Sequence, residues 1–388
     1  MNAAPVHLKL TTRRLNPSPR SRILPQTIPM PKLPLLLIGT YTDNSTDGVH
    51  GIGEGVLGYA FDPVTGALDR RFTHYIEQPT YLAVDQERGL LYANQEIEQE
   101  GQQPCMHAFR LTHAATHSGI EPLGTQPLRG CVPCHIGLQP GRALWVAGYE
   151  SSNLSRIPLT ADGRMLPQSH NLKFEGSGPR EEQDAAHIHC CAYDAVRDRL
   201  FVCDLGDDRV RVLVPDGDDW REEDTLSLNV SAGSGPRHLL PHPTNKDRMF
   251  LIHELWPEVS ALDISGQPSE IFRFLPFDPP DEESQGGAAI RTCNAGRFVY
   301  VSERKTNSMA VLEYRDDVLK LVQRVATHGE KPRDFNLSPD GRWLVVANLN
   351  SHTLALFRRD TDTGELTFER LEEGVKSPSC VVWLESGS

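Results

Sequence analysis

The sequence has no long apolar run. Stretches such as Leu35 to Ile38, which reaches Leu33 only across Pro34, and Trp343 to Ala347 are four or five residues long, whereas a membrane-spanning helix needs about 20 apolar residues. This shortage excludes a transmembrane helix. The chain has 388 residues, of which 38% are hydrophobic. That composition is typical of a soluble globular protein with enough length to bury a core.

The chain also has fewer basic than acidic residues. The chain carries 39 Lys and Arg against 52 Asp and Glu, a formal net charge of −13. Because proteins bind nucleic acid mainly through clustered positive charge, this balance argues against a nucleic-acid partner.

Cysteine is too sparse for a disulfide scaffold. There are eight, and two of them, Cys190 and Cys191, are adjacent. We therefore expect reduced thiols in a cytoplasmic protein.

Residues 1–32 differ from the rest of the chain. They contain lysine, arginine and several prolines but no acidic residue, so we expect a disordered basic arm. Alternatively Met30, just before the first strand, is the real start. The apolar run of about 7 to 15 residues that a secretory signal needs is absent from this segment, which favours a cytoplasmic location.

A repeat organises the remaining sequence. An apolar strand recurs seven times, and from the second copy onward the steps are 45 to 57 residues, the length of one four-stranded propeller blade. The copies are LLLIGTYT from Leu35, GLLYANQE from Gly89, RALWVAGYE from Arg142, RLFVCDLG from Arg199, RMFLIHEL from Arg248, RFVYVSER from Arg297 and RWLVVANL from Arg342.

Each copy of the apolar strand is flanked in the sequence by two further predicted strands. A segment marked by Pro or His precedes the apolar strand, as in GPRHLLPHP from Gly235, and an alternating strand with a tight turn follows it. The last preceding segment, from Ser377, has no strand after it, and the first apolar strand has no such segment before it. We therefore predict an all-β fold, one seven-bladed β-propeller over residues 33–385, closed by pairing of the C-terminal segment with the first blade.

These motifs resemble the lactonase-type seven-bladed propellers, which comprise bacterial-type 6-phosphogluconolactonase and the fungal 3-carboxy-cis,cis-muconate lactonizing enzyme. The resemblance covers nearly the whole chain after Pro34. It rests on IGTYT from Ile38, HIH from His187, GPRH from Gly235, HEL from His253, VYVSER from Val299 and KPRDFNLSPDGRWLVVAN from Lys331.

The resemblance implies a site at the mouth of the central channel. It places catalytic groups at Glu254, His187 and His189, and an anion clamp at Arg237, Arg304 and Arg333. Arginine suits this role because its planar fork matches phosphate or carboxylate. Two departures from the family are His253 before Glu254, where Asn is usual, and Gly148-Tyr149-Glu150, where the family often has Asn-Tyr and glycines.

The activity implied is hydrolysis of an anionic sugar-acid lactone, most simply 6-phosphogluconolactone in the pentose phosphate pathway. Glu254 or one HIH histidine would activate water, with Arg or the other His steadying the carbonyl oxygen. Which histidine acts stays open. A carboxymuconate cycloisomerase and a non-catalytic interaction scaffold are the alternatives. The oligomeric state is not indicated.

We expect no metal and no cofactor. Cys131 to His135 matches a haem-attachment spacing, but the segment is in register with GPRH of another repeat. His187, His189, Cys190 and Cys191 would not converge on zinc, because adjacent strand residues point to opposite faces.

Overall fold

The computed structural model describes residues 1, 33–44, 49–97, 101–113, 118–277 and 286–386. The interpretations given above for residues 1–32 concern a segment that, Met1 aside, lies outside these ranges. In the described part of the chain the helical elements are two 3-10 turns, η1 (Glu181–Gln183) and η2 (Asp224–Leu226), and no helix is long and apolar enough to cross a membrane.

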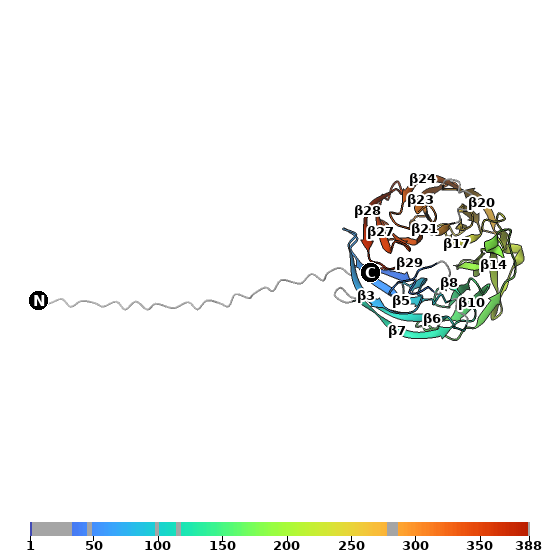
Figure 1. The fold of residues 1–388 in the computed structure, drawn as a ribbon, viewed down its shortest axis with the longest axis horizontal. Helices are drawn as coiled ribbons and strands as arrows, with labels where there is room; N and C mark the ends of the chain where they lie inside the picture. The colour runs from blue at the N-terminus through green and yellow to red at the C-terminus, as the bar shows by residue number, and fades with distance from the viewer. Residues whose placement is uncertain (2–32, 45–48, 98–100, 114–117, 278–285, 387–388) are drawn as a thin grey trace. The chain divides into compact units, whose positions relative to one another are not determined.

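Seven antiparallel sheets form the blades of a propeller, which confirms the predicted fold (Figure 1). From the inner to the outer strand, blade 1 contains β29 (Pro378–Leu384), β1 (Leu35–Thr40), β2 (Val56–Phe61) and β3 (Leu68–His74). Blade 2 contains β4 (Leu82–Asp85), β5 (Leu90–Ala93), β6 (Cys105–His113) and β7 (Ser118–Pro127). Blade 3 contains β8 (Pro133–Gln139), β9 (Ala143–Gly148), β10 (Asn153–Pro158) and β11 (His170–Lys173). Blade 4 contains β12 (Ile188–Asp194), β13 (Arg199–Asp204), β14 (Arg209–Asp216) and β15 (Asp219–Glu222), with the short β16 (Leu228–Asn229) also on β14.

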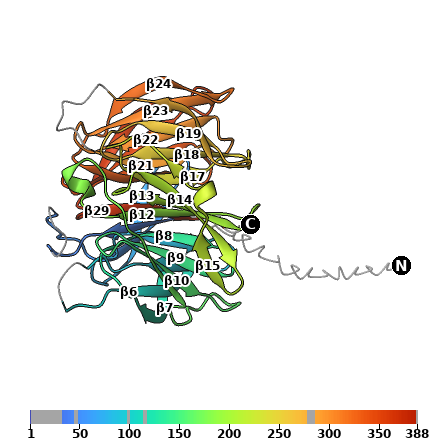
Figure 2. The same cartoon turned by 90° about the vertical axis from the view of Figure 1, so that its right-hand side faces the viewer.

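The same order holds in the last three blades. Blade 5 contains β17 (Pro236–Pro241), β18 (Arg248–His253), β19 (Val259–Asp263) and β20 (Ser269–Phe274). Blade 6 contains β21 (Gly287–Thr292), β22 (Phe298–Glu303), β23 (Ser308–Arg315) and β24 (Val318–Ala326). Blade 7 contains β25 (Pro332–Leu337), β26 (Trp343–Asn348), β27 (Thr353–Arg359) and β28 (Leu366–Glu373). Figure 2 shows blade 6 edge-on, with β24, β23, β22 and β21 following one another from the rim inward.

The inner strands close a ring around the propeller axis. Each contacts the inner strands of both neighbouring blades, in the order β29, β4, β8, β12, β17, β21, β25 and back to β29. The C-terminal strand β29 pairs with β1 from Leu35 opposite Leu384 onward. This pairing confirms the predicted closure, which leaves no open blade at the junction of the two ends.

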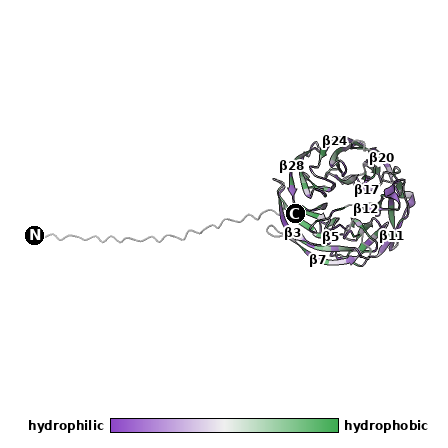
Figure 3. Ribbon diagram, in the orientation of Figure 1, coloured by the Kyte–Doolittle hydropathy of each residue, from purple (hydrophilic) through white to green (hydrophobic). Residues whose placement is uncertain are grey.

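The seven recurring apolar strands are the second strand of each blade, and both of their faces are covered. All six residues of β1 are buried, whereas the outer strand β28 is mostly exposed or half-buried. Alternate residues of β1 serve opposite boundaries: Leu36 and Ile38 pack on blade 7, and Leu35 and Leu37 pack on blade 2. Figure 3 shows the resulting mixture, with hydrophilic segments on outer strands such as β28. Burial on both faces explains why these strands read as apolar runs.

Candidate functional site at the channel mouth

One backbone hydrogen bond recurs in all seven blades and builds the rim of the channel. In six blades the residue that follows the second strand donates its N–H to the carbonyl of the residue directly before the inner strand, at 2.7 to 3.0 Å. In blade 2 the donor Glu96 lies three residues after β5 and the acceptor Gln78 lies four residues before β4, at 3.0 Å. The donors, in blade order, are Tyr41, Glu96, Tyr149, Leu205, Glu254, Arg304 and Leu349. Because the inner strands form a closed ring, these residues gather at one end of the propeller.

A second recurring feature aims side chains into the same end. In six inner strands the register shifts by one residue near the start of the strand; in β21 the shift spans Ala288 and Ala289, and in the other five it falls on a single residue. Such bulges leave one residue unpaired and redirect its side chain. In those five strands the residues at the shift are Cys134, His189, Arg237, Arg333 and Ser379.

Glu254 is the centre of the cluster that these two features produce. Its Oε2 lies 2.7 Å from Nε of Arg237, and its Oε1 lies 2.7 Å from an Nη of Arg304. Nε2 of His189 lies 3.6 Å from Oε2 of Glu254. Four of the six predicted site residues, contributed by blades 4, 5 and 6, therefore meet at one carboxylate.

The charges of this cluster are set by its neighbours. Burial alone would raise the pKa of Glu254, but Arg304 and Arg237 outweigh it and hold the pKa well below its ordinary value of 4.5. Burial, reinforced by Arg237, lowers the pKa of His189 well below 6.5. At neutral pH the cluster thus contains an ionised carboxylate and a neutral imidazole. Nδ1 of that imidazole has no hydrogen-bond partner among the described residues.

His187 occupies a different position from His189. Both rings contact Tyr149, His187 by stacking at 4.4 Å between centroids and His189 edge-on at 5.6 Å. The polar contacts of His187 are an Nε2 to Asp184 Oδ1 distance of 3.0 Å and an Nδ1 to Tyr149 carbonyl distance of 3.3 Å. His187 therefore orients Tyr149, whereas His189 approaches Glu254.

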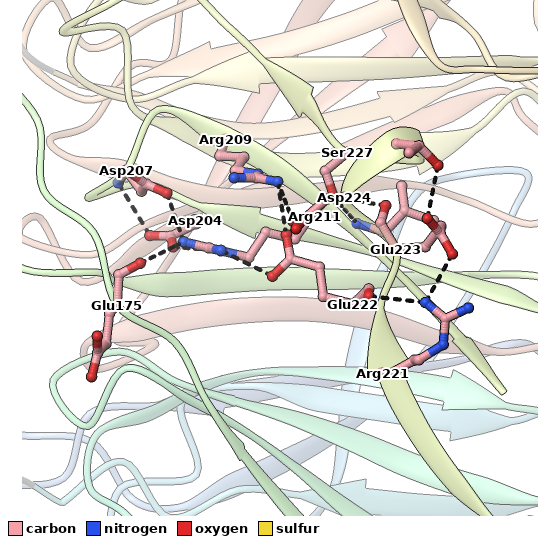
Figure 4. Close-up of polar contacts among 12 residues, drawn as sticks. Glu175, Asp204, Asp207, Arg209, Arg211, Arg221, Glu222, Glu223, Asp224 and Ser227 are labelled. Atoms are coloured by element: carbon pink, nitrogen blue, oxygen red, sulfur yellow. Dashed lines mark hydrogen bonds and ion pairs between the residues drawn. The ribbon is translucent and has the colours of Figure 1, made fainter. Parts of the chain in front are cut away.

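An ion-pair network fixes the start of the inner strand of blade 4 (Figure 4). The backbone N–H of His187 donates to Oδ1 of the fully buried Asp204 at 2.9 Å. Arg211 holds the other oxygen of Asp204 and also contacts Asp207 and Glu222. This network anchors the segment that carries both histidines of the HIH motif.

Arg333 lies on the opposite side of the channel mouth, over blades 1 and 2. Its nearest carboxylate is Glu96, at 3.8 Å, and its guanidinium lies 5.1 Å from the centroid of Tyr41. Glu96 accepts hydrogen bonds from the hydroxyls of Tyr41, at 2.7 Å, and Thr80. Arg333 thus belongs to a second carboxylate cluster.

The channel below the mouth is filled by aromatic rings and a buried ion pair. Tyr81, His135 and His238 contact one another, with centroid distances of 4.4, 5.4 and 6.1 Å. Arg291 pairs with Asp334 at 2.8 Å. Tyr81, His238 and Asp334 line a small space inside the channel, together with Arg237 and Arg333.

Four residues of the site were not predicted as site residues: Tyr41, Glu96 and Tyr149 beside the clusters, and Lys331 at the rim. Of these, Tyr149 was noted in the sequence only as part of a departure from the family pattern. The first three occupy the repeat position of Glu254 and Arg304. That shared position is the signal that could have found them.

Of the zinc candidates, His189 belongs to the Glu254 cluster, whereas Cys190 and Cys191 are buried elsewhere, in two different hydrophobic clusters. All eight cysteines are free thiols. Within the described ranges, no group of three or more His, Cys, Asp or Glu side chains could hold a metal ion.

Together, the fold and the site define a seven-bladed propeller with an arginine, glutamate and histidine cluster at one end of its channel. The model of the lactonase seven-bladed β-propeller family matches residues 35–383. The chain belongs to this family.

Known proteins agree with this assignment. The 6-phosphogluconolactonase of Bacillus subtilis is 30% identical over 358 residues, which cover 89% of this chain and 97% of that protein. A putative 6-phosphogluconolactonase of Bacteroides fragilis is 25% identical, with a TM-score of 0.82 over 95% of this chain and all of that one. The periplasmic gluconolactonase PpgL of Pseudomonas aeruginosa shares the fold, with a TM-score of 0.82 over 91% of this chain and 99% of that one, at 24% identity.

Proposed function

We propose that the protein hydrolyses the lactone of a sugar acid, with 6-phosphogluconolactone as the substrate. The observation that carries this proposal is the Glu254 carboxylate, held by two arginines beside a neutral histidine at one end of the channel. Family membership and the name of the Bacillus subtilis relative support the same chemistry.

His189 is the better candidate for the general base. Arginines occupy both oxygens of the Glu254 carboxylate, Arg237 Nε at Oε2 and an Nη of Arg304 at Oε1, whereas Nδ1 of His189 has no hydrogen-bond partner in the part of the chain that the structure describes. The neutral His189 has its Nε2 toward Glu254, and we assign the ring proton to that nitrogen, which leaves a lone pair on Nδ1. Glu254 then orients His189 and fixes the two arginines.

The reaction follows from these roles. His189 accepts a proton from water as the water oxygen attacks the lactone carbonyl carbon. Arg304 stabilises the negative charge that develops on the carbonyl oxygen. The bond between the carbonyl carbon and the ring oxygen breaks, and the ring oxygen takes the proton from His189. At neutral pH the product acid releases one proton to solution.

The substrate we propose is an anion, although the chain is acidic overall. Arg304, Lys305, Lys331 and Arg333 concentrate positive charge at the mouth, and local charge of this kind attracts an anionic ligand. We therefore propose that the binding partner is an anionic small molecule. The cytoplasmic location of the protein stays a prediction.

Proton release from freshly prepared 6-phosphogluconolactone, measured against the spontaneous rate, tests the proposal. We expect rapid turnover by the wild type and a loss of kcat of about 10²-fold or more in His189→Gln. The matched control is His170→Gln, because His170 lies on the outer strand β11. Thermal unfolding verifies that both variants are folded.

A wild-type rate no higher than the spontaneous rate would overturn the proposal. Turnover of 3-carboxy-cis,cis-muconate would then identify a lactone-forming enzyme. Failure with both compounds would favour a non-catalytic scaffold.

A further inference from the structure

A second concentration of positive charge lies beside Glu254. A cavity of about 420 Å³ is formed by blades 6 and 7, and this volume is within the range of small-ligand sites. We call it the Lys331 pocket; it is lined by Arg304, Lys305, Asn307, Glu330, Lys331 and Asn350. Arg304 belongs to both sites, because it lines this cavity and pairs with Glu254 at 2.7 Å.

The backbone of Lys331 is in an unusual conformation. Its φ is +57°, and the residue directly before the inner strand is also left-handed in three other blades, at Val132, Gly235 and Ser377, as is Gln78, which lies four residues before β4 in blade 2. Each of these residues precedes a proline. Blade 5 uses glycine, for which the conformation is unstrained, whereas lysine is strained there.

Two hydrogen bonds hold that conformation. The N–H of Lys331 donates to Oδ1 of Asn307 at 2.7 Å, and its carbonyl accepts the N–H of Leu349 at 3.0 Å. The rim therefore fixes the backbone of Lys331 and presents its side chain to the pocket.

The pocket is electrostatically suited to an anion. Burial lowers the pKa of Lys331 to about 8, and the positive charges of Arg333 and Arg304 add to this effect. Three cationic side chains line the pocket against one acid, Glu330. A dianion such as a phosphate monoester would relieve the repulsion among them and stabilise the charged lysine.

We propose that the Lys331 pocket binds the phosphate group of a sugar-acid lactone, with Lys331 as the residue that distinguishes phosphorylated from unphosphorylated substrates. This inference rests on the proposed function and deepens it. Since Arg304 joins the pocket to Glu254, a phosphate held by Lys331 would direct the lactone ring toward Glu254 and His189.

The test compares Lys331→Met with the wild type on 6-phosphogluconolactone and on glucono-δ-lactone. We expect the variant to lose at least about tenfold more kcat/KM on the phosphorylated lactone than on the other, because it lacks one charge-assisted contact. Lys331→Arg should restore part of the loss. The matched control is Lys320→Met, since Lys320 is exposed on the outer strand β24.

A binding measurement separates this inference from the proposed function. Calorimetry with inorganic phosphate on the full chain should show binding by the wild type that Lys331→Met loses. Lys331→Gly, which relieves the backbone strain, should fold at least as well and also lose binding. If the wild type hydrolysed neither lactone but bound phosphate through Lys331, the pocket would stand and the proposed reaction would fail.

Two results would overturn the inference. One is an equal loss of kcat/KM on both lactones in Lys331→Met. The other is phosphate binding that is unchanged in that variant or absent from the wild type.

Discussion

Two glutamates occupy the same repeat position on opposite sides of the channel mouth, Glu254 in blade 5 and Glu96 in blade 2. Each donates its backbone N–H to a carbonyl in the segment that leads into the inner strand of its own blade, Glu254 to Gly235 and Glu96 to Gln78. Their side chains differ in exposure: 18% of the Glu254 side chain is accessible, against 3% for Glu96. Their partners differ as well. Glu254 pairs with two arginines, whereas Glu96 accepts hydrogen bonds from two hydroxyls and lies 3.8 Å from Arg333.

The comparison shows that the same position of the scaffold can have a structural role in one blade and a role in the candidate site in another. A carboxylate saturated by buried hydroxyls holds blades together, since its removal leaves buried donors unsatisfied. A carboxylate that is paired with arginines but still accessible can orient groups around a ligand. The fold supplies the position, and the neighbouring blades decide the role.

The largest expected difference between the two carboxylates is in turnover. Glu254→Gln removes the charge that fixes Arg237, Arg304 and His189, so we expect kcat to fall by about 10² to 10⁴. Steady-state hydrolysis of 6-phosphogluconolactone measures this, normalised to the folded fraction found by circular dichroism. A folded variant with a nearly normal rate would refute the role of Glu254.

We expect the folding stability of the protein to depend on Glu96, whereas turnover depends on Glu254. Glu96→Gln replaces one acceptor of the Tyr41 and Thr80 hydroxyls with an amide donor, so we expect a loss of about 1 to 3 kcal/mol in the free energy of unfolding. Its kcat should fall less than about tenfold, because Glu96 does not contact His189. Chemical denaturation of the wild type and of Glu96→Gln measures this difference. Unchanged stability would be evidence against the role of Glu96 in holding blades together.

The smallest expected effect is the contribution of Glu254 to the pH dependence of folding stability. Its folded-state pKa is below its ordinary value of 4.5, so the carboxylate contributes stability above pH 4.5. That contribution is lost as the pH falls toward the folded-state pKa. Denaturation midpoints at pH 7 and pH 3 should therefore differ less in Glu254→Gln than in the wild type. An equal drop in both proteins would show that Glu254 does not carry this stability.

The fold could be predicted because one feature of the sequence, a short apolar strand, recurs seven times for a physical reason. The second strand of every blade is covered on both faces, which requires an apolar run, and seven such runs at blade-length spacing define the propeller. The outer strands were harder to recognise, since strands such as β28 are half exposed and read as ordinary polar sequence.

The site could be predicted only in part. Resemblance pointed to Glu254, Arg237, Arg304 and His189, which the structure brings together. Neither the register shifts that aim His189 and Arg237 into the mouth nor the left-handed conformation of Lys331 leaves a composition or periodicity signal. These features depend on backbone geometry that a single sequence does not display.

The most direct measurement is hydrolysis of 6-phosphogluconolactone by the wild type, Glu254→Gln and Glu96→Gln in one assay at equal concentrations of folded protein. We predict turnover well above the spontaneous rate for the wild type, a rate within about tenfold of it for Glu96→Gln, and a rate lower by about 10² or more for Glu254→Gln. Equal rates for the two variants, or no wild-type turnover, would contradict the assignment of Glu254 to the catalytic centre of a lactone hydrolase.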